Sequence, residues 1–206
     1  MKKYLLLLAL LFLVLANHAA TSSSDLYAKL RSAYQSLKSF QAEVLQSNFY
    51  PQLNKAISYD GKIYFTPGRM LMSFTKPSVQ RLKIEAGRVE LYDASSNTLF
   101  RTDMLPEFGR MNPVEILQLY WTKSSVTVTS EDKNSAGVKL VPAKDDLVRT
   151  LSATLNKNSG IVSKLSYTDR GGNSVTYTFT NIKLNGSIPE SVWNFRYPED
   201  VQVVEQ

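Results

Sequence analysis

The sequence predicts a mainly β protein of the α+β kind, built as an unclosed antiparallel β-barrel of about ten to eleven strands with helices covering its concave face. Three observations lead to this prediction. Apolar and polar residues alternate with a period of two over most of the chain. Turn residues separate nearly all of these runs. Two segments instead repeat apolar residues every three or four positions, as amphipathic helices do.

Residues 1–20 have the features of a secretory signal peptide. Two lysines precede an apolar run over 4–16, and small residues follow it. Since the run is shorter than the roughly 20 residues that a membrane-spanning helix needs, we interpret it as an export signal that is cleaved. The chain contains no cysteine, so neither a disulfide nor a lipid-modified N-terminal cysteine is expected. Residues 21–206 are predicted to form a single domain in the periplasm.

Two helices are predicted from the spacing of apolar residues. Between residues 24 and 40 they recur at intervals of three and four, which indicates an amphipathic helix with Ser24 or Asp25 as its N-cap. A second helix is predicted over 112–121, because a cap residue and Pro113 precede apolar residues at helical spacing. The apolar stripe of each helix must lie on an apolar surface, which we expect to be the predicted sheet.

Strands are predicted wherever every second residue is apolar, because successive side chains of a strand point to opposite faces. Turn signals such as Asp60-Gly61, Pro67-Gly68 and Gly171-Gly172 separate them. Together these runs predict an antiparallel meander with one apolar face. The residues assigned to that face include Ala42, Ile57, Tyr59, Ile63, Leu82, Ile84, Val89, Leu99, Val126, Val128, Val138, Leu140, Leu147, Ala153, Leu155, Ile161, Leu165 and Val175.

The composition excludes several kinds of chemistry. His18, in or beside the predicted signal peptide, is the one histidine of the chain, and there is no cysteine. Ser-His-Asp and Cys-His catalysis and the usual zinc or copper sites therefore lack their side chains. Neither of the glycine-rich phosphate-binding motifs, GxGxxG and GxxxxGKS/T, occurs. We expect no metal and no cofactor.

The charge pattern favours neither nucleic-acid binding nor hydrolysis. The formal net charge is +6, yet beyond Lys2-Lys3 no two basic residues are adjacent, so no nucleic-acid partner is expected. Two carboxylates can hydrolyse a glycosidic bond without histidine, which keeps a hydrolase of envelope polysaccharide as an alternative. The acidic pairs Glu131-Asp132 and Asp145-Asp146, however, stand in polar stretches where solvated turns are expected.

The apolar face of the predicted sheet allows two interpretations. Its residues either pack against the helices as a core or line a cavity, since an open barrel has room for a ligand. Met70 and Met72 lie on this face, and flexible methionine side chains suit irregular aliphatic ligands. The alternation alone leaves both interpretations open, because it is found in any half-buried sheet.

Short motifs follow one another along nearly the whole mature chain. In chain order they are FQAEVLQ from Phe40, the segment from Gly61 to Pro77, Gly87, Tyr92-Asp93, Asn112-Pro113, Leu140-Val-Pro142 and the residues between Phe179 and Val201. In this order they resemble the motifs of the outer-membrane lipoprotein carrier family, LolA, and the resemblance is closest between Phe179 and Val201.

The resemblance implies a carrier and not an enzyme. Members of this family carry the acyl chains of lipoproteins across the periplasm, from a lipoprotein-releasing ABC transporter in the inner membrane to an acceptor at the outer membrane. Acylated lipoproteins are therefore the expected cargo, and a monomer is the expected state. A periplasmic lipid-binding or envelope-stress sensing protein of the same open-barrel architecture is the alternative.

The resemblance also implies where the acyl chains bind, in a hydrophobic cavity on the apolar face beneath a helical lid. Thr66 stands where family members place a lid-latching arginine, and Arg69 follows closely, so these two residues mark the candidate lid or latch region. The residues expected to line the cavity are Phe40, Val44, Phe65, Met70, Met72, Phe74, Leu91, Leu117, Leu151, Tyr167, Tyr177 and Phe179.

Overall fold

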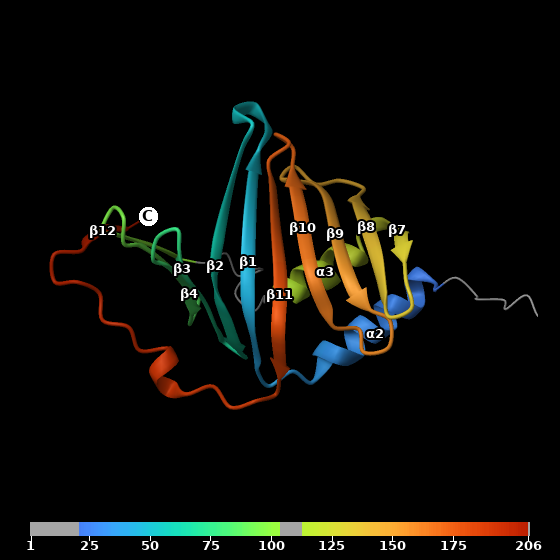
Figure 1. Cartoon of the computed structure of the whole chain (residues 1–206), viewed down its shortest axis with the longest axis horizontal. Coiled ribbons are helices and arrows are strands. Elements are labelled where there is room, and N and C mark those ends of the chain that lie inside the picture. Colours follow the sequence, from blue (N-terminus) through green and yellow to red (C-terminus); the bar gives the residue numbers. More distant parts are fainter. Residues whose placement is uncertain (1–20, 104–112, 206) are drawn as a thin grey trace, which may run out of the picture.

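The computed structural model describes residues 21–103 and 113–205. In this part of the chain it contains two α-helices and a single sheet of twelve strands (Figure 1). The predicted fold class is confirmed, with twelve strands in place of ten or eleven. The predicted signal peptide, residues 1–20, lies outside the described residues.

The sheet is a meander that begins in its middle. β1 pairs with β2 on one side and with β11 on the other, and the strands continue outward to β6 and to β7. β7 and β12 lie at opposite ends of the strand order, so the sheet is open. The strands are β1 (Phe40–Tyr50), β2 (Lys55–Thr66), β3 (Arg69–Lys76), β4 (Gln80–Glu85), β5 (Arg88–Asp93), β6 (Thr98–Asp103), β7 (Ser124–Glu131), β8 (Ser135–Pro142), β9 (Val148–Asn156), β10 (Val162–Asp169), β11 (Ser174–Leu184) and β12 (Gln202–Glu205).

β12 joins the sheet differently from the other strands. The segment after β11, residues 185–201, contains a short 3₁₀ turn, η2 (Glu190–Val192), and leads to the far edge of the sheet (Figure 1, red). There β12 pairs with β6 in parallel, with Val204 beside Phe100. The sheet is therefore antiparallel except at this edge. We call residues 185–201 the C-terminal segment.

The first helix, α2 (Ser23–Gln35), begins slightly earlier than predicted. Its N-cap is Ser22, whose hydroxyl accepts a hydrogen bond from the backbone N–H of Asp25 at 3.1 Å. The prediction of Ser24 or Asp25 as the cap is therefore wrong, because several polar residues precede the apolar stripe and each of them suits a cap. The second helix, α3 (Pro113–Trp121), forms where predicted, while Asn112 lies outside the described residues.

Both helices lie on one face of the sheet, behind the strands β8 to β10 in the view of Figure 1. We call this the concave face and the opposite one the convex face. Strand alternation points Val44, Ile63 and Met72 to the concave face, where they are buried with Leu30 of α2 and Leu117 of α3. The predicted contact between the helix stripes and the apolar face of the sheet is thus confirmed.

Polar and aromatic contacts fix the helices on the sheet. The hydroxyl of Tyr34 accepts a hydrogen bond from the backbone N–H of Val162 at 3.2 Å. Burial raises the pKa of Tyr34 to about 12, so the side chain stays neutral. Tyr27 of α2 stacks on Trp121 of α3, with 5.5 Å between ring centroids. These contacts make the helices and the β7–β11 half of the sheet one packed unit.

The predictions for Asp60-Gly61 and for Leu147 are also wrong. Asp60-Gly61 is not a turn but lies inside β2, at a shift in register against β3. A Cβ at Gly61 would overlap the carbonyl oxygen of Ser73 and atoms of Phe74, so glycine marks a close approach of two strands here. Leu147 is not on the apolar face either. It lies in the loop before β9 and is exposed.

A second apolar cluster lies on the convex face, beneath the C-terminal segment. Trp193 is buried there beside Tyr64, with 6.5 Å between ring centroids. Phe195 and Tyr197 pack against Tyr92 at 5.7 and 5.4 Å. The buried apolar residues of this convex cluster are Leu71, Tyr92, Leu99 and Trp193. They attach the C-terminal segment to the β2–β6 half of the sheet.

Candidate functional site

The concave face of the sheet is the candidate binding site, because it collects the residues that were expected to line a cavity. Eleven of the twelve belong to one apolar cluster or pack against it. Tyr167 and Tyr177 are partly buried, and Leu91 is exposed outside the cluster. The nine that are buried are Phe40, Val44, Phe65, Met70, Met72, Phe74, Leu117, Leu151 and Phe179.

The centre of the concave face is aromatic and sulfur-rich. Met70 lies opposite Phe65, which in turn lies opposite Phe40 on the next strand. The rings of Phe40 and Phe179 meet edge to face at 5.9 Å. Burial raises the pKa of Tyr177, so its hydroxyl stays neutral next to this cluster. The face therefore offers an uncharged surface that suits aliphatic chains.

Where the helices cover the concave face, its residues are packed as a core. Leu30 and Leu117 from the helices and Leu140 from β8 are fully buried in the same cluster. The structure therefore supports the packed-core interpretation for the part of the concave face that the helices cover. A ligand could reach these residues only if the helices moved away from the sheet.

The apolar surface continues past this core to the β12 edge, where it is exposed. Cross-strand pairing places six apolar residues in one row on the concave face, in the order Ile63, Met72, Leu82, Leu91, Phe100 and Val204. Ile63 and Met72 are buried. Leu91, Phe100 and Val204 are 39%, 43% and 39% exposed. We call the row from Ile63 to Val204 the apolar row; its outer part is accessible without any movement of the helices.

Phe100 and Val204 were not predicted, and Leu99 was assigned to the wrong face. Leu99 pairs with Tyr92 and is buried in the convex cluster, so its neighbour Phe100 points to the concave face. At this edge both faces of the sheet carry apolar residues, and alternation cannot tell them apart. The register of β5 against β6 supplies the missing information, since it sets Phe100 beside Leu91.

Among the described residues, Arg69 of the candidate latch region bonds to Thr66 and to the C-terminal segment, and not to α2 or α3. The guanidinium of Arg69 binds both carboxylate oxygens of Glu190 at 2.9 Å, and it lies over the ring of Trp193 at 4.3 Å. Thr66 accepts a longer hydrogen bond from Arg69 Nε, at 3.4 Å. Arg69 precedes Met70, so alternation turns it to the convex face, where it binds the C-terminal segment.

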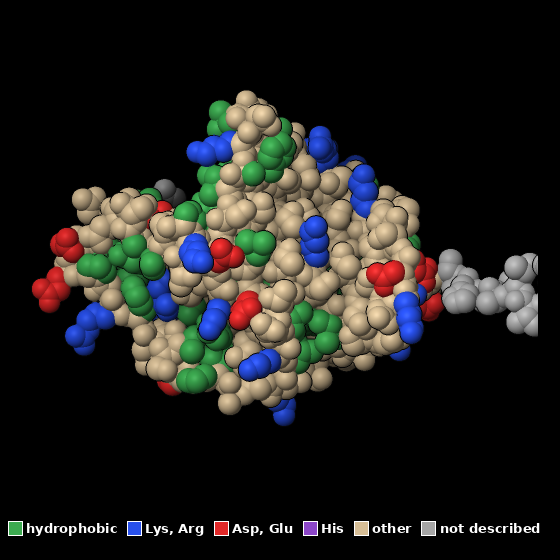
Figure 2. Space-filling model, in the orientation of Figure 1, with side chains coloured by type: hydrophobic (Ala, Val, Ile, Leu, Met, Phe, Trp, Pro, Cys, Tyr) green, Lys and Arg blue, Asp and Glu red, His purple; other side chains and the backbone are tan. Residues whose placement is uncertain are grey.

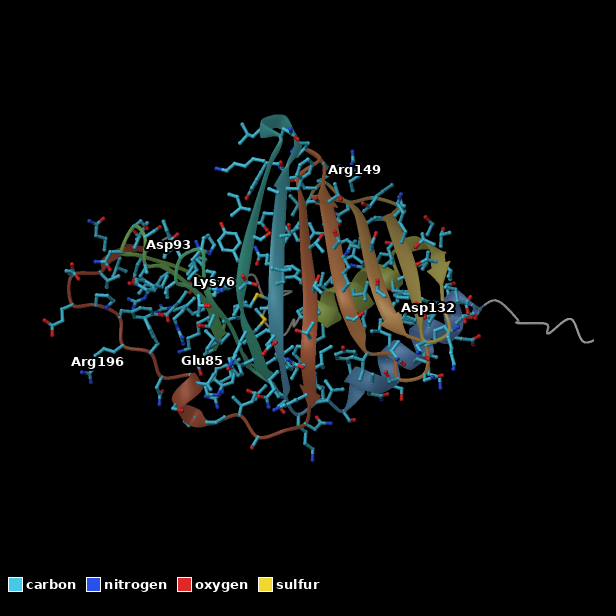
Figure 3. The ribbon with its side chains drawn as sticks, in the orientation of Figure 1. Lys76, Glu85, Asp93, Asp132, Arg149 and Arg196 are labelled. Atoms are coloured by element: carbon cyan, nitrogen blue, oxygen red, sulfur yellow. The ribbon has the colours of Figure 1, made fainter. Side chains whose placement is uncertain are left out.

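A cleft of about 810 Å³, lined by both polar and apolar side chains, opens on the convex face between the central strands and the C-terminal segment. Charged side chains contribute to its lining, which distinguishes it from the buried apolar cluster of the concave face. Lys76, labelled in Figure 3, is one of the side chains at this cleft. The charged residues that line it are Glu43, Asp60, Lys62, Lys76 and Arg81. The sequence did not reveal the cleft, because one of its walls comes from the distant C-terminal segment.

Asp132, Asp145 and Asp146 lie in connecting loops, as predicted, whereas Glu131 is the last residue of β7. Asp132 accepts hydrogen bonds from the backbone N–H groups of Asn134 and Ser135, both at 2.7 Å. Hydrogen bonds from Lys157 and Thr21 lower the pKa of Glu131 to about 2. A glycosidase needs one carboxyl group with a raised pKa as its general acid. The pKa values of Glu131 and Asp132 are both lowered, so neither residue suits this role.

Asp145, in the second pair, also supports its own loop. It accepts hydrogen bonds from the backbone N–H groups of Leu147 and Val148 at 2.9 and 2.6 Å. The hydroxyl of Tyr120 donates to it at 2.7 Å, which connects the loop to α3.

In the described part of the chain, neither helix is long and apolar enough to span a bilayer.

Comparison with known proteins gives a family match over most of the chain. The sequence signature of the family described as outer membrane lipoprotein carrier protein LolA matches residues 35–196. An outer-membrane lipoprotein carrier protein of Pseudoalteromonas translucida (strain TAC 125) is 27% identical over 205 residues, which cover 95% of each chain.

Solved structures with a similar fold have much lower sequence identity. An uncharacterised conserved protein of Thermus thermophilus is 12% identical, with a TM-score of 0.57 over 90% of this chain and 100% of that one. The MucA/MucB complex of Pseudomonas aeruginosa contains a chain that is 13% identical, with a TM-score of 0.50 over 84% of this chain and 60% of that one. At these identities the likeness concerns the fold alone.

Proposed function

This chain belongs to the outer membrane lipoprotein carrier protein LolA family, a family of binding and transport proteins, and on that premise we propose that it carries lipoproteins across the periplasm. In this proposal the acyl chains of the cargo bind to the concave face. The protein takes them up at the inner membrane and delivers them to the outer membrane.

The observation that carries the proposal is the apolar row, which runs from the buried core to an exposed edge. Leu91, Phe100 and Val204 offer a first contact to an acyl chain, and Met72 and Ile63 continue the same surface inward. Each methylene that leaves water contributes about 0.8 kcal/mol, so a multiply acylated lipoprotein cannot cross an aqueous space unaided. A continuous apolar surface provides what such a cargo requires.

Movement of the helices would let the acyl chains reach the rest of the concave face. Bound chains would then replace the contacts that Leu26, Leu30 and Leu117 now make with the sheet. Contacts between acyl chains and the sheet replace contacts between these leucines and the sheet. The net gain in free energy is therefore much smaller than the free energy of removing the acyl chains from water. A carrier that holds its cargo in this way can release it to an acceptor.

The remaining parts of the proposal follow from the resemblance and the N-terminal sequence. A lipoprotein-releasing ABC transporter in the inner membrane supplies the cargo, and an outer-membrane acceptor removes it. Residues 1–20 direct export and are cleaved, which leaves residues 21–206 as one periplasmic domain that acts as a monomer. The reaction needs no cofactor, since no covalent bond changes.

Native mass spectrometry with a triacylated lipoprotein in mild detergent tests the proposal. We expect a one-to-one complex that releases its lipoprotein when outer-membrane vesicles are added. Phe100→Asp should prevent formation of the complex, because it places a charge on the accessible end of the apolar row. Leu45→Asp is the matched control, since Leu45 is 42% exposed but lies on the convex face.

The outcomes separate the proposal from its alternative. A complex that Phe100→Asp abolishes and Leu45→Asp preserves supports acyl binding on the concave face. Binding of phospholipid or glycolipid without lipoprotein would transfer the function to a lipid-binding or envelope-stress sensing protein of the same architecture. A chain that binds neither kind of molecule would refute acyl binding altogether.

A further inference from the structure

One end of the sheet carries the two most exposed large apolar side chains among the described residues. Leu53 follows β1 in a 3₁₀ turn, η1 (Pro51–Leu53), and Leu147 lies in the loop before β9. Each is 72% exposed. Phe49, near the end of β1, is exposed as well. The four loops at this end, residues 51–54, 122–123, 143–147 and 170–173, are called the loop end below.

These loops adjoin one another although they are distant in sequence. The backbone N–H of Arg170 donates to the carbonyl oxygen of Leu147 at 3.2 Å, and the N–H of Ala143 donates to the carbonyl oxygen of Lys123 at 3.3 Å. A Cβ on Gly172 would lie 3.4 Å from the ring of Pro51, so the β10–β11 turn touches the β1–β2 turn.

The spacing of the strands sets the width of the loop end. β2, β1, β11, β10 and β9 are consecutive in the sheet. At about 4.8 Å for each step, β2 and β9 lie about 19 Å apart, so the loops before and after them form one surface. Figure 1 shows these loops along the upper side of the molecule, with the β1–β2 turn projecting furthest.

The loop end is also rich in basic side chains that the rest of the described structure does not use. The side chains of Lys55, Lys123, Lys144 and Arg149 make no hydrogen bond or ion pair with any described residue. Figure 2 shows basic side chains beside the hydrophobic ones of the β1–β2 turn, and Figure 3 labels Arg149 on the same side. Of the three nearby carboxylates, Asp145 and Asp169 accept hydrogen bonds from their own loops, and Asp146 makes no hydrogen bond or ion pair with a described residue. The four unpaired basic side chains outnumber this one unpaired carboxylate.

We propose that the loop end is a membrane-contacting surface, which inserts Leu53 and Leu147 into the interface of an anionic phospholipid bilayer. The leucines bury apolar area among the lipid head groups, and the four free cations face the lipid phosphates. This surface lies on loops outside the concave face and needs no cargo. It places the carrier against a membrane while the apolar row remains available.

A bilayer fits this surface better than a protein partner does. The two leucines lie in loops and are each 72% exposed, so each presents a separate apolar tip. A lipid interface is soft and adapts to separate projecting anchors. Isolated basic side chains around an apolar tip are the usual arrangement for such binding, because anionic lipids attract them without requiring a fixed geometry.

Co-sedimentation of the purified, cargo-free protein with vesicles tests the proposal. The vesicles contain phosphatidylethanolamine and phosphatidylglycerol, with pure phosphatidylcholine vesicles for comparison. We expect binding to the anionic vesicles that weakens as salt is added. Leu53→Ser should reduce the partition coefficient about tenfold, and Leu53→Ser with Leu147→Ser about a hundredfold. Both leucines are exposed, so these variants should fold as the parent does.

Val203→Ser is the matched control, because Val203 is 46% exposed at the β12 edge, away from the loop end. Unchanged vesicle binding by this variant, together with the loss in the leucine variants, supports the proposal. Equal binding by the double leucine variant and the parent would overturn it, as would an equal loss in Val203→Ser. Binding of a membrane protein but not of vesicles would assign the loop end to a protein partner and also overturn it.

Discussion

Replacing Leu30 by alanine tests whether α2 moves when acyl chains bind. Leu30 is fully buried between α2 and the concave face. Leu→Ala changes at such positions lower the free energy of unfolding by about 2–5 kcal/mol, because they remove transfer free energy and leave a cavity. We therefore expect Leu30→Ala to destabilise the protein by about 3 kcal/mol, with much of the loss in the contact between α2 and the sheet.

The same change should strengthen the binding of an acyl chain. If the bound state has α2 displaced, weaker docking of α2 raises the population of the binding-competent state. Every 1.4 kcal/mol lost from the docking of α2 then contributes about a factor of ten in affinity. Even if half of the destabilisation falls on this contact, Leu30→Ala should bind a fluorescent acyl probe about tenfold more tightly than the parent.

Leu99→Ala provides the matched control. Leu99 is also fully buried, but it lies in the convex cluster beneath the C-terminal segment. The chemical change and the burial are the same as at Leu30, so a similar loss of stability is expected. Its effect on the docking of α2 should be small, and the affinity for the acyl probe should stay unchanged.

Two measurements on the three proteins decide the question. Urea unfolding, followed by tryptophan fluorescence, gives the free energies of unfolding, and titration with the acyl probe in buffer gives the affinities. Weaker probe binding by Leu30→Ala would show that the contacts of α2 support the site and do not compete with the ligand. A tighter but equal affinity in both variants would show a general effect of instability.

Two further predictions concern the C-terminal segment and the stability of the protein at low pH. Trp193→Ala removes the buried ring of the convex cluster and should lower the free energy of unfolding by about 3–5 kcal/mol. It should also make the bond after Phe195 more sensitive to chymotrypsin, while cleavage after the exposed Leu53 in the parent and the variant serves as the control. The hydrogen bonds from Lys157 and Thr21 lower the pKa of Glu131 from 4.5 to about 2, so the stabilisation that they give is present above about pH 4.5 and is lost as the pH falls toward 2. Glu131→Gln should therefore show a smaller fall in Tm between pH 7 and pH 3 than the parent.

The results that contradict these two predictions are equally specific. A chymotrypsin pattern in Trp193→Ala that matches the parent would mean that the β12–β6 pairing alone holds the C-terminal segment. An unchanged fall in Tm for Glu131→Gln would mean that Glu131 has the same pKa in the folded and unfolded chains, contrary to its contacts with Lys157 and Thr21.

The residues that sequence reasoning placed correctly lie in elements with a clear period. Met70, Met72 and Phe74 share a buried face of β3, as their alternation indicates. Leu26 and Leu30, one helical turn apart, are both buried on α2. In these elements one face is apolar and the other is not, so the period alone identifies the buried side.

The errors lie where a local pattern has more than one solution. Asp60-Gly61 has the composition of a turn, yet the two residues continue β2, because glycine is also needed where two strands approach closely. Leu99 and Phe100 are both apolar, and the packing of the C-terminal segment on the convex face decides which of them is buried there. For Arg69, a candidate latch residue, nothing in the sequence indicated its partner Glu190, which lies in the C-terminal segment more than a hundred positions away.

By itself, the sequence determined the class of fold, the two helices, the apolar face of the central strands and the family, since all of these depend on residue types and spacings within short segments. The tertiary structure alone decided that the covered part of this face is a packed core, and that the apolar row stays exposed at Leu91, Phe100 and Val204. It alone gathered Leu53, Leu147 and four free cations at the loop end. The reason is physical: exposure and proximity depend on which segments meet in space, and these segments are separated by up to about 140 residues of chain.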